Sequence, residues 1–257
     1  MVLPIGDTPN PKGFPFVNYL LIAANVAVFL MFTVPLEGTR ASATDPRVME
    51  YVREMSRALA GRVPAGAFDN VSLWDLAVFD WGFRPARPSI VDLFTSMFMH
   101  AGFMHLFGNM LFLWIYGDNV EHTVGRFRYL LVYLACGVSA VLFHWAFTPD
   151  SLMPMVGASG AISGVLGAYL VLHPKRRVSV LLMRMMVDVP GYVAVGIWFL
   201  FQIASGLFDA GNGGGGGVAY SAHVAGFVAG MILAKPMSMQ AVREEADPLV
   251  VLRRRIP

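Results

Sequence analysis

Long apolar stretches separated by shorter polar ones run through most of this chain. A helix that crosses a bilayer needs about 20 largely apolar residues, because the hydrocarbon core is about 30 Å thick. Six segments have this character: 16–36, within 98–116, 129–147, 158–172, 192–208 and 218–234. The pattern therefore predicts an all-α integral membrane protein, a bundle of six transmembrane helices.

The polar stretches divide the chain into three parts. Residues 1–15 are polar and rich in proline, and they lack the charged start, short apolar run and cleavage site of a signal peptide. Residues 16–236 are predicted to form one membrane domain, whose longest connection, an outer loop at about 37–92, joins the first two segments. Residues 237–257 form a polar tail.

The charges of the short connections indicate how the bundle sits in the membrane. Lysine and arginine gather after the second, fourth and sixth segments, while the connections 148–157 and 209–217 have neither. Cytoplasmic loops carry the excess of Lys and Arg, so these three regions and both termini are predicted to be cytoplasmic. The first loop carries seven arginines and falls on the outer side, but loops of that length partly escape the rule. The basic residues concerned are Arg126, Arg128, Lys175, Arg176, Arg177, Arg184, Lys235, Arg243 and 253–255.

Composition agrees with a chain that has lipid as its solvent. Hydrophobic residues make up 56% and charged residues 14%, whereas soluble domains carry roughly 25% charged residues. A net charge of +2 is too small to favour a nucleic acid as partner. The single cysteine, Cys136, lies in an apolar segment and has no internal disulfide partner, which indicates a packing role.

Polar side chains near the starts of three segments are the candidate chemistry. Segments two, four and six all run from the outer face inward, so residues near their starts share one depth. Polar groups inside a bilayer are costly and are functional candidates by default. His105 and Asn109 share a helix face on segment two, Ser159 opens segment four, and His223 lies early in segment six. Three helices thus bring a hydroxyl, two imidazoles and an amide to one level.

These residue types fit acyl transfer. A serine becomes a nucleophile when a base takes its proton, and histidine is the usual base, which assigns Ser159 and His223. The oxyanion of the tetrahedral intermediate needs donors, and the Asn109 amide, the His105 ring and the Ser159 backbone N–H are candidates. A Ser–His dyad is the preferred reading. Asp150 and Asp209, in outer loops, stay open as less favoured third members.

Glycines provide a route for the helices to meet. Small residues let helix backbones approach closely, so the sixth segment is predicted to lean on the fourth. Each motif alone is more often plain packing: a serine bonds the carbonyl one turn back, and a lone His or Asn joins helices. Packing alone is a much poorer explanation for a serine, two histidines and an asparagine that all lie at one depth. The glycines are Gly157, Gly160, Gly164 and Gly167 on one side and Gly226 and Gly230 on the other.

Four motifs in order resemble the rhomboid family of intramembrane serine proteases, of bacterial type with six helices. Residues 98–109 are similar to its His-x4-His-x3-Asn signature, and 117–125 to its Glu-x3-Gly loop. Residues 157–160 are similar to its nucleophile motif, and 222–230 to its Ala-His-x2-Gly-x3-Gly helix. The likeness covers about 92–234 and five of the six segments.

The resemblance implies a role for each matching residue. Ser159 is then the nucleophile and His223 the general base, with His105, Asn109 and the Ser159 amide around the oxyanion. His100 is a supporting residue, as are the glycines of the two helix motifs, and Glu121 and Gly125 are structural on the cytoplasmic side. The substrates implied are transmembrane proteins in the lipid bilayer, cut in or near the membrane without metal or cofactor, and the site implied is a bacterial cytoplasmic membrane.

Two departures from the family pattern stand out. Some members have Tyr or Phe four residues after the serine, against the catalytic histidine, and this chain has Ser163 there. Some have a Trp-Arg pair in the first loop, where this chain has Trp81-Gly82-Phe83-Arg84. The glycine-rich stretch 211–217 is expected to be a movable cap over His223 or a simple linker.

Rival functions predict other features. A catalytically inactive relative, which binds membrane proteins for quality control, normally lacks the Ser or the His. A transporter would show inverted repeats or broken helices with an ionisable site at the midplane. A metalloprotease would need His-Glu-x-x-His, and an aspartyl protease two intramembrane aspartates.

Overall fold

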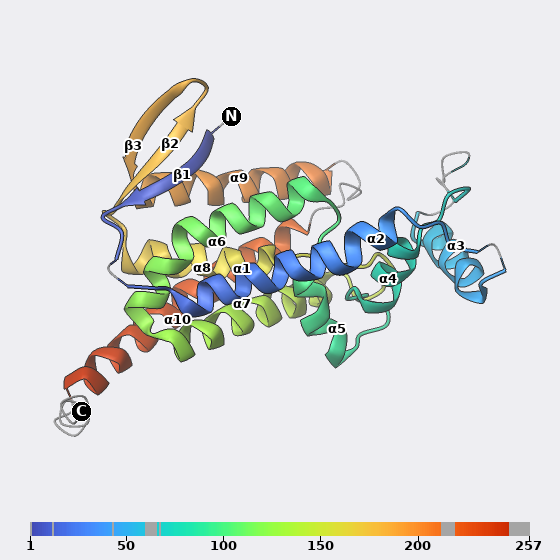
Figure 1. Ribbon diagram of the computed structural model, residues 1–257, viewed down its shortest axis with the longest axis horizontal. Coiled ribbons are helices and arrows are strands. Elements are labelled where there is room, and N and C mark those ends of the chain that lie inside the picture. The colour runs from blue at the N-terminus through green and yellow to red at the C-terminus, as the bar shows by residue number, and fades with distance from the viewer. Residues whose placement is uncertain are drawn as a thin grey trace.

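A bundle of helices along one axis makes up most of the computed structural model, which describes residues 2–11, 13–42, 44–59, 66, 68–211 and 219–246 (Figure 1). Each of the six predicted segments forms a helix, and the prediction of an all-α membrane bundle is confirmed. The bundle helices are α1 (Phe16–Val28), which continues through a π-helical turn (Phe29–Thr33) into α2 (Val34–Glu37), then α6 (Phe103–Val124), α7 (Arg126–Phe147), α8 (Ser159–Leu172), α9 (Gly191–Gly211) and α10 (Tyr220–Ala246).

Fewer than six described helices meet the usual length of a membrane span. By length and composition, Phe16–Glu37, Arg126–Phe147 and Gly191–Phe208 qualify. A fourth is added if Ile90–Phe98 and Phe103–Val124, which meet at a 90° bend, count as one. The second segment was predicted to lie within 98–116, and α6 begins inside that range, at Phe103 after the bend, and continues beyond it to Val124. Because α8 has only 14 residues, the six-span count stays a prediction.

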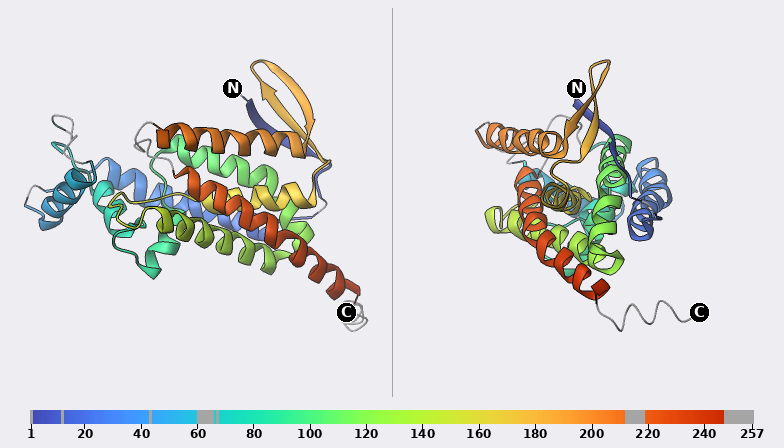
Figure 2. Two further views of the ribbon diagram at one scale, coloured as in Figure 1. Left: turned by 180° about the vertical axis from the view of Figure 1, so that it is seen from behind. Right: turned by 90° about the vertical axis from the view of Figure 1, so that its left-hand side faces the viewer.

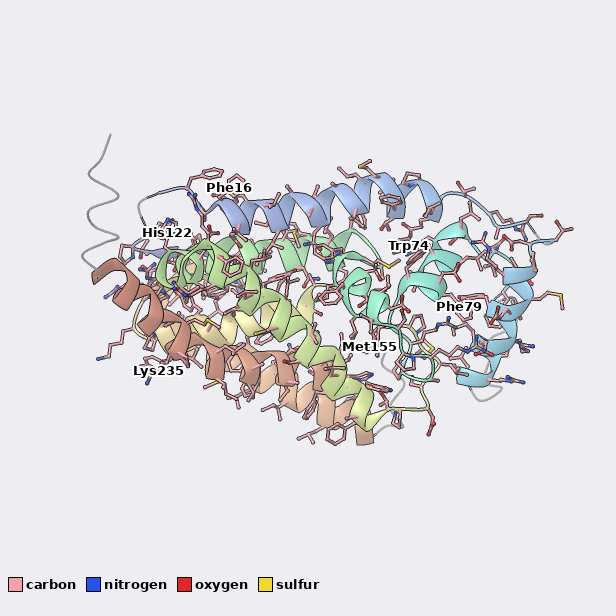
Figure 3. All side chains as sticks on the ribbon, turned by 90° about the horizontal axis from the view of Figure 1, so that it is seen from below. Phe16, Trp74, Phe79, His122, Met155 and Lys235 are labelled. Atoms are coloured by element: carbon pink, nitrogen blue, oxygen red, sulfur yellow. The ribbon has the colours of Figure 1, made fainter. Side chains whose placement is uncertain are left out.

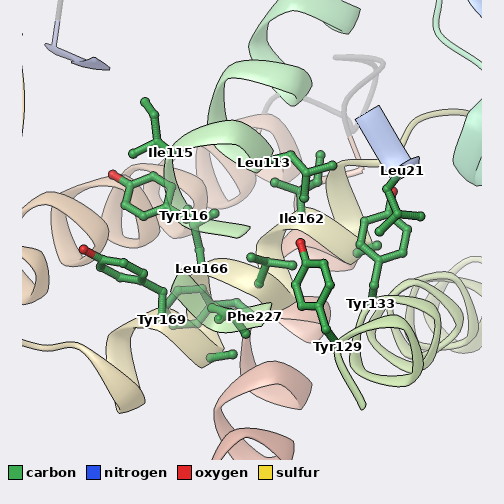
Figure 4. Packing of buried hydrophobic residues seen from close by; sticks show 14 of the residues in the cluster. Leu21, Leu113, Ile115, Tyr116, Tyr129, Tyr133, Ile162, Leu166, Tyr169 and Phe227 are labelled. Atoms are coloured by element: carbon green, nitrogen blue, oxygen red, sulfur yellow. The ribbon is translucent and has the colours of Figure 1, made fainter. Parts of the chain in front are cut away.

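Helix α8 is the centre of the packing. Every residue from Ala161 to Tyr169 is buried, which explains why this helix is apolar all round instead of on one face. Figure 4 shows aromatic and aliphatic side chains from α1, α6, α7, α8 and α10 meeting there. The short fourth segment is therefore surrounded by protein.

A three-stranded antiparallel sheet at one end of the bundle was not predicted. It consists of β1 (Val2–Thr8), β2 (Arg177–Leu182) and β3 (Met185–Pro190), in the order β1-β2-β3 (Figure 1). The register pairs Val2 with Leu182 and Thr8 with Arg177, and β2 alternates, with Val178 and Val180 buried. The predicted N-terminal segment and the polar connection after the fourth segment thus form one structure.

The predicted outer loop also folds, at the other end of the bundle. It contains α3 (Pro46–Ala58), α4 (Leu73–Trp81) and the start of α5 (Ile90–Thr95), which leads into a 3₁₀ turn (Ser96–Phe98). Each of the three α-helices has an N-cap residue whose side chain accepts a hydrogen bond from a backbone N–H of the first turn; these residues are Asp45, Ser72 and Ser89. Figure 3 shows Trp74, Phe79 and Met155 toward this end and Phe16, His122 and Lys235 at the opposite end.

The last turn of α6 and the glycine after it fix the starts of α1 and α7. The carboxylate of Glu121 accepts from the backbone N–H groups of Val17 and Asn18, at 3.2 and 2.7 Å, and so caps the start of α1. Gly125 follows with φ +86°, a left-handed conformation that lets α7 begin at once. The two residues that the family resemblance marks as structural thus occupy a cap and a turn.

Candidate active site

Ser159 is the first residue of α8, and the loop before it is held from two sides. Phe83 and Met155 form a short antiparallel bridge with N···O distances of 3.0 and 2.8 Å. The Gly157 N–H donates to the Ser96 carbonyl at 2.8 Å. Gly157 has φ +128°, and a Cβ atom there would lie 2.8 Å from the His105 ring, so only glycine fits. The outer loop and the 3₁₀ turn that follows it therefore set the backbone that presents the serine.

His223 lies in the first turn of α10 and contacts the serine directly. Its Nε2 is 2.8 Å from Ser159 Oγ. One further contact fastens the start of α10 to α7: His144 Nδ1 lies 2.7 Å from Ser221 Oγ. The two candidate residues, from separate helices, thus form a hydrogen-bonded pair.

The glycines explain why α8 and α10 come so close. A Cβ atom at Gly226 would lie 3.0 Å from the carbonyl carbon of Gly160, and one at Gly230 would lie 2.6 Å from that of Gly164. Any side chain at these positions meets the backbone of the other helix. Seen from behind, α10 runs obliquely across α8 (Figure 2). The predicted glycine contact between the fourth and sixth segments is present in this form.

The other ring nitrogen of His223 has a partner that sequence reasoning missed. Its Nδ1 lies 2.7 Å from Oε1 of Gln202, a residue of α9 that is 7% exposed. The sequence left open only the carboxylates of Asp150 and Asp209 as third members. A polar side chain in the middle of an apolar segment is itself a signal, and by that rule Gln202 qualifies. Three helices therefore contribute to one chain of contacts from Gln202 through His223 to Ser159.

Ser163 does not replace the missing aromatic residue. Its hydroxyl donates to the Ser159 carbonyl at 2.6 Å, a bond within α8, and its side chain is buried. Aromatic contacts to the His223 ring come instead from Trp198, with centroids 6.5 Å apart, and from Tyr220, which lies edge-on at 6.2 Å. The ring is thus flanked from α9 and from its own helix.

The predicted oxyanion donors lie on the first half of α6. The Asn109 side chain is buried, and its Nδ2 has no hydrogen-bond partner among the described residues. His105 lies beside Gly157, and the buried His100 ring meets it edge-on, with centroids 5.1 Å apart. A buried amide donor without a partner costs free energy, so its presence is consistent with a ligand that accepts from it.

A family model described as "Rhomboid domain" matches residues 87–240, which is more than half of the chain. The chain belongs to the rhomboid family. The match includes all the site residues named above except Phe83, while the strand β1, helix α1 and most of the outer loop precede it.

Several curated rhomboid relatives are similar over this region. The Rhomboid protease GluP of Bacillus subtilis is 30% identical over 147 residues, which are 57% of this chain and 26% of that protein. RHOMBOID-like protein 6, mitochondrial, of Arabidopsis thaliana is 31% identical over 58% of this chain and 49% of its own length. Rhomboid protein 1, mitochondrial, of Saccharomyces cerevisiae is 29% identical over 56% of this chain and 41% of its own length. The chain thus spans from about a quarter to half the length of these relatives.

The rhomboid match and the apolar helices together make this an integral membrane protein of a protease-type family. Its relatives include bacterial and mitochondrial proteins, so the family alone does not select one membrane. The predicted cap at 211–217 falls almost entirely outside the described residues, as does the end of the predicted tail.

Proposed function

We propose that this chain is an intramembrane serine endopeptidase, which hydrolyses peptide bonds in or near transmembrane segments of other proteins. The observation that carries the proposal is the 2.8 Å contact between Ser159 Oγ and His223 Nε2, made between two tightly packed helices. Protease-named relatives over the same region support it. An inactive relative is the alternative, and the presence of both side chains in contact weighs against it.

The reaction would proceed in two acyl transfers. Ser159 Oγ attacks the scissile carbonyl carbon while His223 Nε2 takes the hydroxyl proton. The C–N bond then breaks, and His223 returns the proton to the leaving amine. Water attacks the acyl-enzyme with the same base and releases the serine. A locally unwound substrate is required, because helical carbonyls are hydrogen-bonded and shielded.

The oxyanion would be stabilised by groups that the substrate meets on arrival. The Asn109 Nδ2 is buried without a partner and is available to donate. The Ser159 backbone N–H lies in the first turn of α8, where helix N–H groups lack intrahelical acceptors. The His105 ring, next to Gly157, is the third candidate. Each such donor contributes about 10²–10³-fold in kcat.

We also propose six spans in a bacterial cytoplasmic membrane, with the sheet and the C-terminal end of α10 on the cytoplasmic side. The basic connections support this, because Arg126 and Lys175 lie beside the ends of α6 and α8 at one end of the bundle. Single cysteines at residues 127 and 149, introduced in a Cys136→Ala background, test it with a membrane-impermeant thiol reagent. Labelling of residue 127 from the outside of intact cells would refute the orientation.

The enzyme proposal is tested with purified protein in detergent and a labelled transmembrane peptide. Ser159→Ala should lower cleavage by more than about 10³-fold and abolish reaction with a fluorophosphonate probe, while the fold is retained. The matched control is Ser163→Ala, one turn further along α8, whose hydroxyl donates to a backbone carbonyl of the same helix. Full activity of Ser159→Ala would end the assignment.

A further inference from the structure

Gln202 is a buried polar group that the two-residue mechanism does not use. It lies in α9, in an otherwise apolar stretch, and only 7% of its surface is exposed. Burying an amide costs free energy unless its polar atoms find partners. Its Oε1 lies 2.7 Å from His223 Nδ1, so the base of the proposed reaction is that partner.

The chemistry of this contact selects one form of the imidazole. A neutral histidine carries one proton, so one ring nitrogen donates and the other accepts. An amide oxygen has no proton to give, so Nδ1 must donate to Gln202 Oε1. Nε2 is then the acceptor, and it faces the Ser159 hydroxyl at 2.8 Å. This is the form in which His223 can take the serine proton.

The reverse arrangement would be unproductive. An amide NH₂ turned toward Nδ1 would favour the proton on Nε2, which would then donate to Ser159 Oγ instead of accepting from it. The aromatic neighbours cannot make this choice, because Trp198 and Tyr220 pack against the ring and do not distinguish its two nitrogens. Only the hydrogen bond from α9 does so among the contacts of the described residues.

We propose that Gln202 is the positioning residue of this enzyme, which holds His223 as the Nδ1–H tautomer with Nε2 aimed at Ser159. This inference rests on the proposed function for its kinetic consequences. Other serine hydrolases give this task to a buried carboxylate. In a site surrounded by lipid a carboxylate is costly to desolvate, whereas a neutral amide supplies the same acceptor without a charge.

The placement of Gln202 also makes the base depend on a third helix. Ser159 belongs to α8 and His223 to α10, which are joined through their glycines. Gln202 belongs to α9, which lies at the edge of the bundle in the end-on view of Figure 2. A displacement of α9 would therefore break the hydrogen bond that selects the Nδ1–H tautomer, while Ser159 and His223 stayed side by side.

Nitrogen NMR of the protein labelled with ¹⁵N-histidine tests the tautomer without any substrate. The His223 signals are identified by their loss in His223→Ala. Wild type should show a protonated Nδ1 and an unprotonated Nε2 at neutral pH. Gln202→Leu should lose this pattern, and Gln202→Glu, which keeps the acceptor, should retain a protonated Nδ1. An unprotonated Nδ1 in wild type, or an unchanged pattern in Gln202→Leu, would overturn the inference.

Kinetics give the second readout. Gln202→Leu should lower kcat for a labelled transmembrane peptide by about 10²-fold with KM nearly unchanged, because alignment of the base matters in the transition state. Gln202→Glu should recover at least a tenth of the wild-type kcat. The control is Asn25→Leu, another buried amide, whose Nδ2 donates to the Leu21 carbonyl one turn back in α1 and which should affect thermal stability alone.

The outcomes separate the two proposals. If wild type cleaves in a Ser159-dependent way and Gln202→Leu has wild-type kcat, the positioning role fails and the proposed function stands. If Ser159→Ala cleaves as well as wild type, the proposed function fails, and the NMR result still decides the tautomer. If Gln202→Leu does not fold, the wild-type spectrum and Gln202→Glu carry the test.

Discussion

Gly226→Ala is the sharpest test of how α8 and α10 bring the site together. The added Cβ atom would lie 3.0 Å from the carbonyl carbon of Gly160, with the carbonyl oxygen closer still. Non-bonded carbon atoms settle at about 3.5–4.0 Å, and the obstacle is backbone, which has no rotamer to change. The two helices must therefore separate by roughly 1 Å at this level.

The separation acts directly on the candidate pair. Gly160 follows Ser159 in the chain, and Gly226 lies one turn beyond His223. A displacement of about 1 Å would stretch the 2.8 Å contact past the range of a hydrogen bond. We expect kcat to fall by about 10²-fold. Overpacking should also cost about 1–3 kcal/mol of stability.

Cleavage of a labelled transmembrane peptide and thermal unfolding in detergent measure the two effects. The control is Gly196→Ala in α9, where an added Cβ atom meets nothing within 4 Å. That variant should keep its activity and gain slightly in stability, because alanine is the better helix former by about 0.5–1 kcal/mol. If Gly226→Ala matched Gly196→Ala in both assays, the reasoning from close helix contact would be refuted.

Two further predictions concern buried polar groups. Asn109→Leu removes a buried donor that has no partner within the described structure. We expect kcat to fall by about 10²–10³-fold while Tm stays the same or rises. A lower Tm with unchanged kcat would contradict the oxyanion role. Asp7 accepts from Tyr169 and Asn119, and burial raises the pKa of its carboxyl above the ordinary 3.8. Its contribution to stability is therefore present below 3.8 and lost as pH rises through the raised pKa. The Tm of Asp7→Asn minus that of wild type should thus increase as pH rises from 3.8 through the raised pKa. A difference that falls over this pH range would show that the pKa of Asp7 is lowered instead.

The helices were predictable because their signal is local. An apolar run of about 20 residues identifies itself without reference to the rest of the chain. Alternating spans then place the starts of the second, fourth and sixth segments at one end. This reasoning named Ser159 and His223 from separate helices, and the structure places their side chains 2.8 Å apart.

The sheet was not predictable because its signal is non-local. Thr8 pairs with Arg177, and neither short strand has enough alternating positions to stand out beside the apolar helices. The capped helices of the outer loop were missed for a different reason: they have 13, 9 and 6 residues, so each is far shorter than the apolar run of about 20 residues that marks a membrane span.

Gln202 shows a third limit. Its cost in a bilayer marks it as a candidate, but a sequence does not say which way one face of α9 points. Only the packing of α9 beside α10 reveals that the amide oxygen meets His223 at 2.7 Å. The partner of a catalytic group is thus harder to find than the group itself when a third helix supplies it.

The pairing of β1 with β2 has a consequence for biosynthesis. The partner of Thr8 is made about 170 residues later, which at ribosomal rates of about 5–20 residues per second is a delay of roughly 10 to 30 seconds. Until then the first strand has no edge to join. The sheet therefore forms late in folding, only after the helix that carries the serine has left the ribosome.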